Sequence, residues 1–209
     1  MVKPFQRHEQ SEGPGHGYCS HAQWQLVKQT DEEILIEVKY PEDNDIDKLV
    51  QRIYPTKDEP KLNVELQIFA RKSCNLPIAV HPTLRLDDWS RPSASSSSEY
   101  KPAKLYSNSL LPGAFNFGVA LPGKHEPSSI IKPFTRFESL EAIEVLTERR
   151  IKDFSRFPLE ENTENVVQLC NCNGRFAIYN QPSNTSFVLE WEKEKFNSVQ
   201  IWMSNRGKN

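Results

Sequence analysis

The chain has 209 residues, enough for one large domain or two small ones. Its formal net charge is −2, with 26 basic and 28 acidic residues interspersed, which argues against a nucleic-acid-binding surface. No apolar run approaches the roughly 20 residues of a transmembrane helix, and residues 1–9 lack the apolar core of a secretion signal. We therefore expect a cytoplasmic protein with neither nucleic acid nor a membrane as partner.

The four cysteines indicate structural thiols and no metal site. None of them forms a C-x-x-C pair, and the C-x-C of Cys170 and Cys172 has no second pair at zinc-site spacing. In a strand these two side chains would share one face and serve as small core residues. Cys19 and Cys74 stand alone in the sequence.

The first half of the chain predicts an irregular segment followed by strands. Residues 1–15 contain the breaker cluster Gly13-Pro14-Gly15. Strands are predicted over residues 34–40, 49–54 and 62–70. The last of these alternates strictly, with apolar side chains on its even positions and polar ones on Asn63, Glu65 and Gln67. This pattern is typical of an antiparallel sheet with one buried and one solvated face.

Residues 76–86 predict a buried strand that carries a histidine. Five apolar or small residues lead into His81, and Pro82 then restricts the backbone and removes a ladder donor. Leu84 and Leu86 resume the alternation around Arg85. The strand should end or bulge at His81, which is either a group available for chemistry or a histidine hydrogen-bonded in or near the core.

The second half predicts short strands joined by loops and turns. Residues 87–103, with serines at 95–98, read as a loop insertion that either covers a site at His81 or is a surface insertion. Residues 105–137 suggest short strands and loops. Residues 139–150 fit a short helix capped by Ser139 or another strand.

The last strands predict the fold class. Strands are expected over residues 166–170 and 175–179, joined by a hairpin-like turn at 171–174, and then over 187–191 and 199–203. Short, regularly spaced strands with Pro, Asn and Gly turns, and no strand–helix alternation, predict an all-β sandwich or barrel.

Two histidine segments in this order resemble a known family. The first is His16-Gly17-Tyr18, with Trp24 eight residues after the histidine, and the second is His81 followed by Leu84 and Leu86. In an all-β chain this combination is similar to the aldose 1-epimerase (galactose mutarotase-like) family, over about residues 16–206. The resemblance implies an antiparallel β-supersandwich, present in part over residues 16–209. It also implies interconversion of the α and β anomers of a neutral aldose, with a small-molecule sugar as partner and no cofactor or metal.

The resemblance also implies roles for individual residues. His81 would be the general acid of ring opening, a role that suits a group titrating near neutral pH, and His16 would be the sugar-oxygen ligand and its electrostatic partner. Tyr18, Trp24 or Trp202 would offer an aromatic wall to the sugar, and the alternative role for each is core packing. Arg85 is a further candidate for binding the substrate.

Two departures from the family pattern bear on the substrate and on the activity. Sugar-phosphate epimerases of the wider family carry an arginine where this chain has Ser20, which disfavours a phosphorylated sugar unless Arg71, Arg85 or Arg206 replaces it. The family's catalytic glutamate lies in a Gly-x-x-x-Glu segment near its C-terminus, and Asn209 comes before any such segment.

Glu190, Glu192 and Glu194 do not occupy that motif, and the strands that precede the His16 motif in the family are missing as well. We therefore expect a chain truncated at both ends. The alternative function is a non-catalytic carbohydrate-binding or interaction protein that lacks the base.

Overall fold

The structure is a computed structural model that describes residues 17–76, 78–84, 108–121, 129–146, 151–157, 159 and 163–204. The predicted irregular segment 1–15 and the predicted loop 87–103 lie outside the described residues. Leaving the first five residues of the chain aside, the chain divides into two compact units, Gln6–Pro82 and Thr83–Asn209. They are called the N-terminal unit and the C-terminal unit below, and each is described by itself. The single mutarotase-like domain expected over 16–209 stays a prediction.

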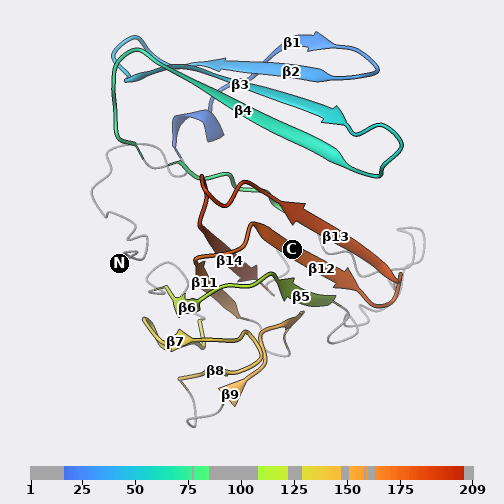
Figure 1. The fold of residues 1–209 in the computed structure, drawn as a ribbon. Coiled ribbons are helices and arrows are strands. Elements are labelled where there is room, and N and C mark those ends of the chain that lie inside the picture. The colour runs from blue at the N-terminus through green and yellow to red at the C-terminus, as the bar shows by residue number, and fades with distance from the viewer. Residues whose placement is uncertain are drawn as a thin grey trace, which may run out of the picture. The chain divides into compact units, whose positions relative to one another are not determined.

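The N-terminal unit is built on one antiparallel sheet whose strands are neighbours in chain order (Figure 1). A short 3-10 turn, η1, precedes the sheet, and each strand returns beside the previous one, as the alternating pattern predicts. The strands predicted at 34–40, 49–54 and 62–70 are confirmed. The elements are η1 (Tyr18–Ser20), β1 (Gln25–Gln29), β2 (Ile34–Lys39), β3 (Ile46–Pro55) and β4 (Leu62–Ala70).

The burial predicted for this sheet is wrong for β4. Its apolar side chains are exposed, with Leu62 at 69 % and Val64 at 55 %. Among the described residues of this unit, Val38, Ile46 and Leu49 form a small core, which residues from η1 and its neighbours cover. Alternation is a property of the strand, whereas burial needs a second layer of structure above it. Among the described residues, η1 and its neighbours form such a layer over Val38, Ile46 and Leu49.

The strand predicted over residues 76–86 is wrong for the part that the structure describes. Leu76 and residues 78–84 have no strand pairing, and all of them are exposed, with Ile78 at 51 % and Val80 at 57 %. Pro77 and Pro82 have no backbone N–H and therefore remove two donors from any ladder in this short segment. The loss of these two donors disfavours strand pairing more than the apolar run favours it.

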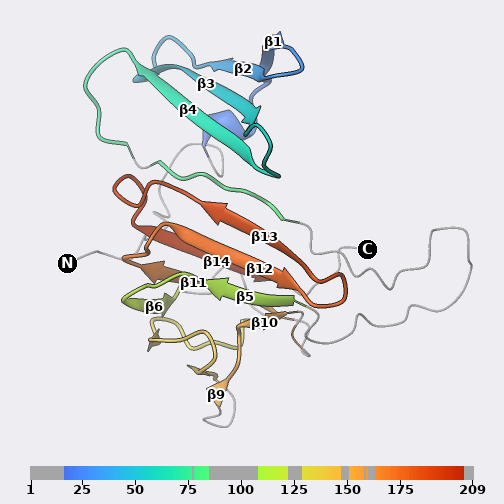
Figure 2. The same ribbon diagram turned by 45° about the vertical axis from the view of Figure 1, so that its right-hand side comes forward.

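The C-terminal unit contains two four-stranded antiparallel sheets and a small hairpin of β8 and β9 (Figures 1 and 2). The strands predicted at 166–170, 175–179, 187–191 and 199–203 are confirmed to within a few residues. One sheet has the order β10 (Arg156–Phe157), β5 (Asn108–Pro112), β12 (Arg175–Asn180), β13 (Thr185–Glu190). The other has the order β14 (Ser198–Ser204), β11 (Glu164–Cys170), β6 (Phe117–Ala120), β7 (Arg136–Phe137). The hairpin strands are β8 (Ile143–Glu144) and β9 (Ile151–Lys152).

One hydrophobic core joins the two sheets of the C-terminal unit. Leu110 and Ile178 come from the sheet of β5 and β12, and Val167 and Leu169 come from the sheet of β6 and β11. Phe154, with no exposed surface, fills the same core. The unit is therefore sandwich-like, and the all-β prediction is confirmed. The described residues contain no α-helix, and accordingly no helix among them is long and apolar enough to cross a membrane.

The hairpin predicted at residues 171–174 is wrong, because β11 and β12 lie in different sheets. Asn171 and Gly174 both have positive φ, 54° and 86°, and reverse the chain as a turn does. The N–H of Cys172 donates to the carbonyl of Asn197 at 2.9 Å, and the N–H of Asn173 donates to the carbonyl of Ala114 at 2.9 Å. These bonds to other loops carry the chain across the sandwich instead of back along β11.

The helix-or-strand alternative at residues 139–150 resolves toward a strand over its described part. The side chain of Ser139 accepts a hydrogen bond from the N–H of Glu141 at 3.1 Å, which closes a turn rather than capping a helix. The two residues of β8 follow, and residues 147–150 lie outside the described part of the chain.

Candidate functional site

His81, the predicted general acid, lies on exposed, non-strand backbone at the end of the N-terminal unit. Its neighbours Val80 and Pro82 are also exposed. A histidine that solvent reaches can contact a dissolved molecule, which a histidine enclosed in the core cannot. His16 and Arg85, the predicted partner and a predicted ligand, lie outside the described residues.

Tyr18 and Trp24 lie together around the small core of the N-terminal unit. The ring of Tyr18 packs on that of Tyr40, with centroids 4.7 Å apart, and the indole N–H of Trp24 donates to the carbonyl of Cys19 at 2.9 Å. Both predicted sugar-wall residues are half-buried. This arrangement supports the packing role for each of them, because their apolar faces cover Val38 and its neighbours.

Tyr40, whose ring packs on that of Tyr18, also has a polar contact. Burial, together with a hydrogen bond to Cys19, raises the pKa of Tyr40 to about 12. Its hydroxyl therefore stays protonated at neutral pH and does not serve as a base.

Trp202 lies on β14 in the C-terminal unit and is 53 % exposed. Alternation along β14 turns Ile201 and Met203 toward the core and leaves Trp202 and Gln200 on the opposite face. An exposed indole with an amide two residues away can stack on a sugar ring and bind its hydroxyls. Sequence reasoning missed Gln200, although its spacing of two from Trp202 in a predicted strand was the available signal.

The predicted site residues thus belong to two different units. Tyr18, Trp24 and His81 are part of the N-terminal unit, and Trp202 is part of the C-terminal unit. The structure brings Tyr18 and Trp24 together around one core, and it places Trp202 on a separate strand face beside Gln200.

Arg71, considered above as a replacement phosphate ligand, is committed to its own chain. Its guanidinium donates to the carbonyls of Pro41, Asn44 and Ile46 at 2.5–2.9 Å and pairs with the carboxylate of Asp47 at 2.9 Å. These bonds close the connection between β2 and β3 against the end of β4. A guanidinium engaged in this way has few donors left for a phosphate.

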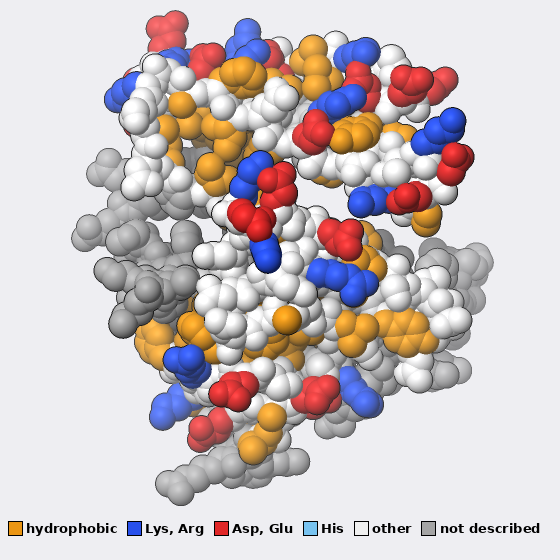
Figure 3. Space-filling view, viewed as in Figure 1, with side chains coloured by type: hydrophobic (Ala, Val, Ile, Leu, Met, Phe, Trp, Pro, Cys, Tyr) orange, Lys and Arg blue, Asp and Glu red, His pale blue; other side chains and the backbone are white. Residues whose placement is uncertain are grey.

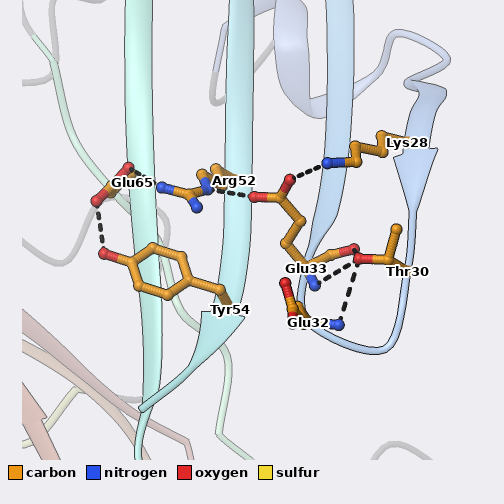
Figure 4. Close-up of polar contacts among 7 residues, drawn as sticks. All are labelled: Lys28, Thr30, Glu32, Glu33, Arg52, Tyr54 and Glu65. Atoms are coloured by element: carbon orange, nitrogen blue, oxygen red, sulfur yellow. Dashed lines mark hydrogen bonds and ion pairs between the residues drawn. The ribbon is translucent and has the colours of Figure 1, made fainter. Parts of the chain in front are cut away.

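The solvated face of the N-terminal sheet carries a chain of ion pairs (Figure 4). Glu33 accepts hydrogen bonds from Lys28 at 2.6 Å and from Arg52 at 2.5 Å, and Arg52 also lies 3.6 Å from Glu65. Tyr54 donates to Glu65 at 2.6 Å. The bonds from Lys28 and Arg52 lower the pKa of Glu33, so its carboxylate is a weaker proton acceptor than an ordinary glutamate. The network suits a structural role and not that of a general base.

The thiols of the C-terminal unit are buried, as predicted for structural cysteines. Cys170 is 1 % exposed and Cys172 is 8 % exposed. Burial raises the pKa of both thiols, that of Cys172 to about 11. Within the described residues, no group of three or more His, Cys, Asp or Glu side chains is placed to hold a metal ion.

Asn165 is a buried polar residue that the sequence analysis did not single out. It is fully buried, and its side-chain oxygen accepts hydrogen bonds from the N–H of Ile130 at 3.0 Å and from the hydroxyl of Ser129 at 3.2 Å. Its amide donates to Thr163 at 3.0 Å. A buried amide with all these partners fixes the segment at 129–130 against β11.

With this geometry in place, comparison with known proteins adds no assignment: no family model, curated protein or solved structure matches the chain.

Proposed function

We propose that this chain is an aldose 1-epimerase-like protein with the galactose mutarotase type of supersandwich, and that it interconverts the anomers of a neutral aldose. The motif of His16, Tyr18 and Trp24, followed by His81 in an all-β chain, supports the proposal. The observation that carries it is the exposure of His81, because a general acid must reach the ring oxygen of a dissolved sugar. The commitment of Arg71 to its own backbone favours a neutral sugar over a sugar phosphate.

The proposed reaction needs one acid and one base. The imidazolium of His81 donates its proton to the ring oxygen while a base removes the proton of the anomeric hydroxyl, and the C1–O5 bond breaks to give the open-chain aldehyde. Rotation about C1–C2 and reclosure on the other face of the carbonyl give the other anomer and return both protons. In this reaction His16 holds a sugar oxygen. No carboxylate is assigned as the base.

The test is polarimetry of freshly dissolved α-glucose and α-galactose with the purified chain. General acid catalysis contributes about 10²–10⁴ in rate, so His81→Ala should slow mutarotation by about that factor, and His81→Gln should do the same. His21→Ala is the matched control, because His21 is also an exposed histidine of the N-terminal unit. A wild-type rate equal to that of buffer, or a rate unaffected by His81→Ala, rules out catalysis through His81.

A second candidate is a non-catalytic carbohydrate-binding protein, and the half-buried positions of Tyr18 and Trp24 favour it. With these rings engaged in packing, the exposed ring of Trp202 is an aromatic surface for binding alone. Calorimetry with the same two sugars separates the candidates. Binding without mutarotation, weakened by Trp202→Ala, supports this one, and the absence of any binding excludes both.

A further inference from the structure

β4 is a long and exposed edge strand. It pairs with β3 on one side, and no other described strand pairs with it. All of its nine residues except Asn63 are exposed, among them Leu66 and Ile68 at 37 % each. Exposed edges of folded proteins are usually blunted by a proline, a bulge in the strand or unpaired charges. β4 has no internal proline, and its one charged residue, Glu65, is already bonded to Tyr54.

The free backbone groups of β4 belong to its even-numbered residues. Pro55 has no N–H, so its pair with Leu62 is a non-hydrogen-bonded pair of the β3–β4 ladder. The neighbouring pair, Thr56 and Lys61, is a hydrogen-bonded pair, as this alternation requires, because the N–H of Thr56 donates to the carbonyl of Lys61 at 2.8 Å. Alternation along an antiparallel ladder then turns the N–H and C=O groups of Leu62, Val64, Leu66 and Ile68 away from β3. The same four residues carry exposed apolar side chains, and Phe69 is an exposed apolar side chain on the other face.

The sequence of β4 is complementary to itself in the antiparallel direction. With Leu66 opposite Leu66 of a second copy, Val64 lies opposite Ile68 and Leu62 lies opposite Ala70, so that apolar side chains meet on one face. On the other face Glu65 lies opposite Gln67, whose amide can donate to the carboxylate. A register with Glu65 opposite itself would place two like charges in contact. The charge pattern therefore disfavours the register centred on Glu65. The register centred on Leu66 is the one that pairs the whole of β4, Leu62–Ala70, with its counterpart.

We propose that β4 is the contact surface for a second copy of this chain, paired antiparallel about a two-fold axis at Leu66. The pairing satisfies the outward backbone groups of both edges and continues the sheet from one copy into the other. A two-fold axis closes the assembly as a dimer, because each copy uses the same edge. This surface is independent of the proposed sugar chemistry.

The oligomeric state of the full chain is the first measurement. Sedimentation velocity over a range of concentrations should show a monomer–dimer equilibrium. Hydrogen exchange of the backbone amides of Val64, Leu66 and Ile68 should slow as the dimer forms. A monomer at all concentrations overturns the proposal, and so does a dimer in which these amides exchange as fast as in the monomer. Open-ended assembly overturns the two-fold pairing.

Charge substitutions on the axis test the register. Leu66→Lys and Leu66→Asp each place two like charges opposite one another, and each should raise the dimer dissociation constant at least about tenfold. Mixing the two variants should restore a mixed dimer, a result that a misfolded variant cannot give. Leu26→Lys is the matched control, because Leu26 is an exposed leucine on β1 at the other edge of the sheet, and it should leave the dimer intact. Failure of the mixed dimer to form, or dissociation by Leu26→Lys, overturns the assignment to β4.

Discussion

The N-terminal and C-terminal units contain similar strand patterns but bury them to different degrees. The apolar side chains of β4 are exposed, whereas most of those of β11 are buried. β4 alternates strictly and leaves Leu62 and Val64 more than half exposed, whereas β11 buries Val167 on one face and Gln168 on the other. β4 is the edge of a sheet whose described residues bury a core of Val38, Ile46 and Leu49, and β11 is an inner strand of a sheet that packs against another. Figure 3 shows apolar side chains exposed among charged ones where Figure 1 places β1 to β4. Strand formation and strand burial are therefore separate outcomes, and only the second depends on layers.

The largest difference in stability is expected between the same leucine-to-alanine substitution made in each of the two units. Leu169→Ala removes a side chain that is 1 % exposed from the sandwich core and should lower the free energy of unfolding of the C-terminal unit by about 2–5 kcal/mol. Leu62→Ala, at a side chain that is 69 % exposed, should change stability by no more than about 0.5 kcal/mol. Urea denaturation followed by circular dichroism measures both. Equal losses would contradict the difference in burial between the two strands.

A smaller loss is expected from adding an atom inside the sandwich. A Cβ at Gly118 would overlap the ring of Phe137, its partner across β6 and β7. Overpacking of this kind costs about 1–3 kcal/mol, so Gly118→Ala should lower the urea midpoint of the C-terminal unit. Combining it with Phe137→Leu should recover part of the loss, since the double variant has room for the methyl group. No change in Gly118→Ala would show that β6 and β7 are not packed this closely.

Removing the buried amide of Asn165 should have an effect of similar or slightly smaller size. Asn165→Ala leaves the N–H of Ile130 without its acceptor in a partly buried site, which costs about 1–3 kcal/mol. Asn197→Ala is a control, because the side chain of Asn197 is exposed. Thermal melts of the two variants measure both losses. A larger loss for Asn197→Ala would mean that the amide of Asn165 does not hold its segment.

The smallest effect should come from the ion pairs of the N-terminal sheet. Glu33 has a pKa below its ordinary value of 4.5, because Lys28 and Arg52 stabilise its charged form. The resulting stability is present above pH 4.5 and is lost as the pH falls through the lower pKa of the folded state. Glu33→Gln should therefore flatten the acid side of the stability profile of this unit slightly. Urea midpoints at about pH 6.5 and about pH 3.5 test this, and an unchanged pH dependence would show that the exposed pairs contribute nothing measurable.

The strands were the most predictable part of the fold. The patterns at 34–40, 62–70 and 175–179 predicted β2, β4 and β12 nearly to the residue, because alternation and turn residues are local signals. The pattern at 76–86 misled, because its apolar run was given more weight than Pro77 and Pro82. The turn at 171–174 misled in another way, since a reversal of the chain does not specify which sheet receives the next strand.

The candidate site was less predictable than the strands. The residue types came from motifs, yet whether a ring covers a core or faces solvent depends on what packs against it. Trp24 and Trp202 look alike in the sequence, but the indole N–H of Trp24 is bonded to the carbonyl of Cys19 while Trp202 stays half exposed. Gln200 became visible as a candidate only when the face of β14 was known.

The sequence by itself determined that this protein is all-β and where most of its strands run, because both follow from local spacing and residue chemistry. Only the tertiary structure decided which apolar faces are buried, that β11 and β12 belong to opposite sheets, and that His81 is exposed. Each of these depends on contacts between residues far apart in the chain, and no local pattern records such contacts.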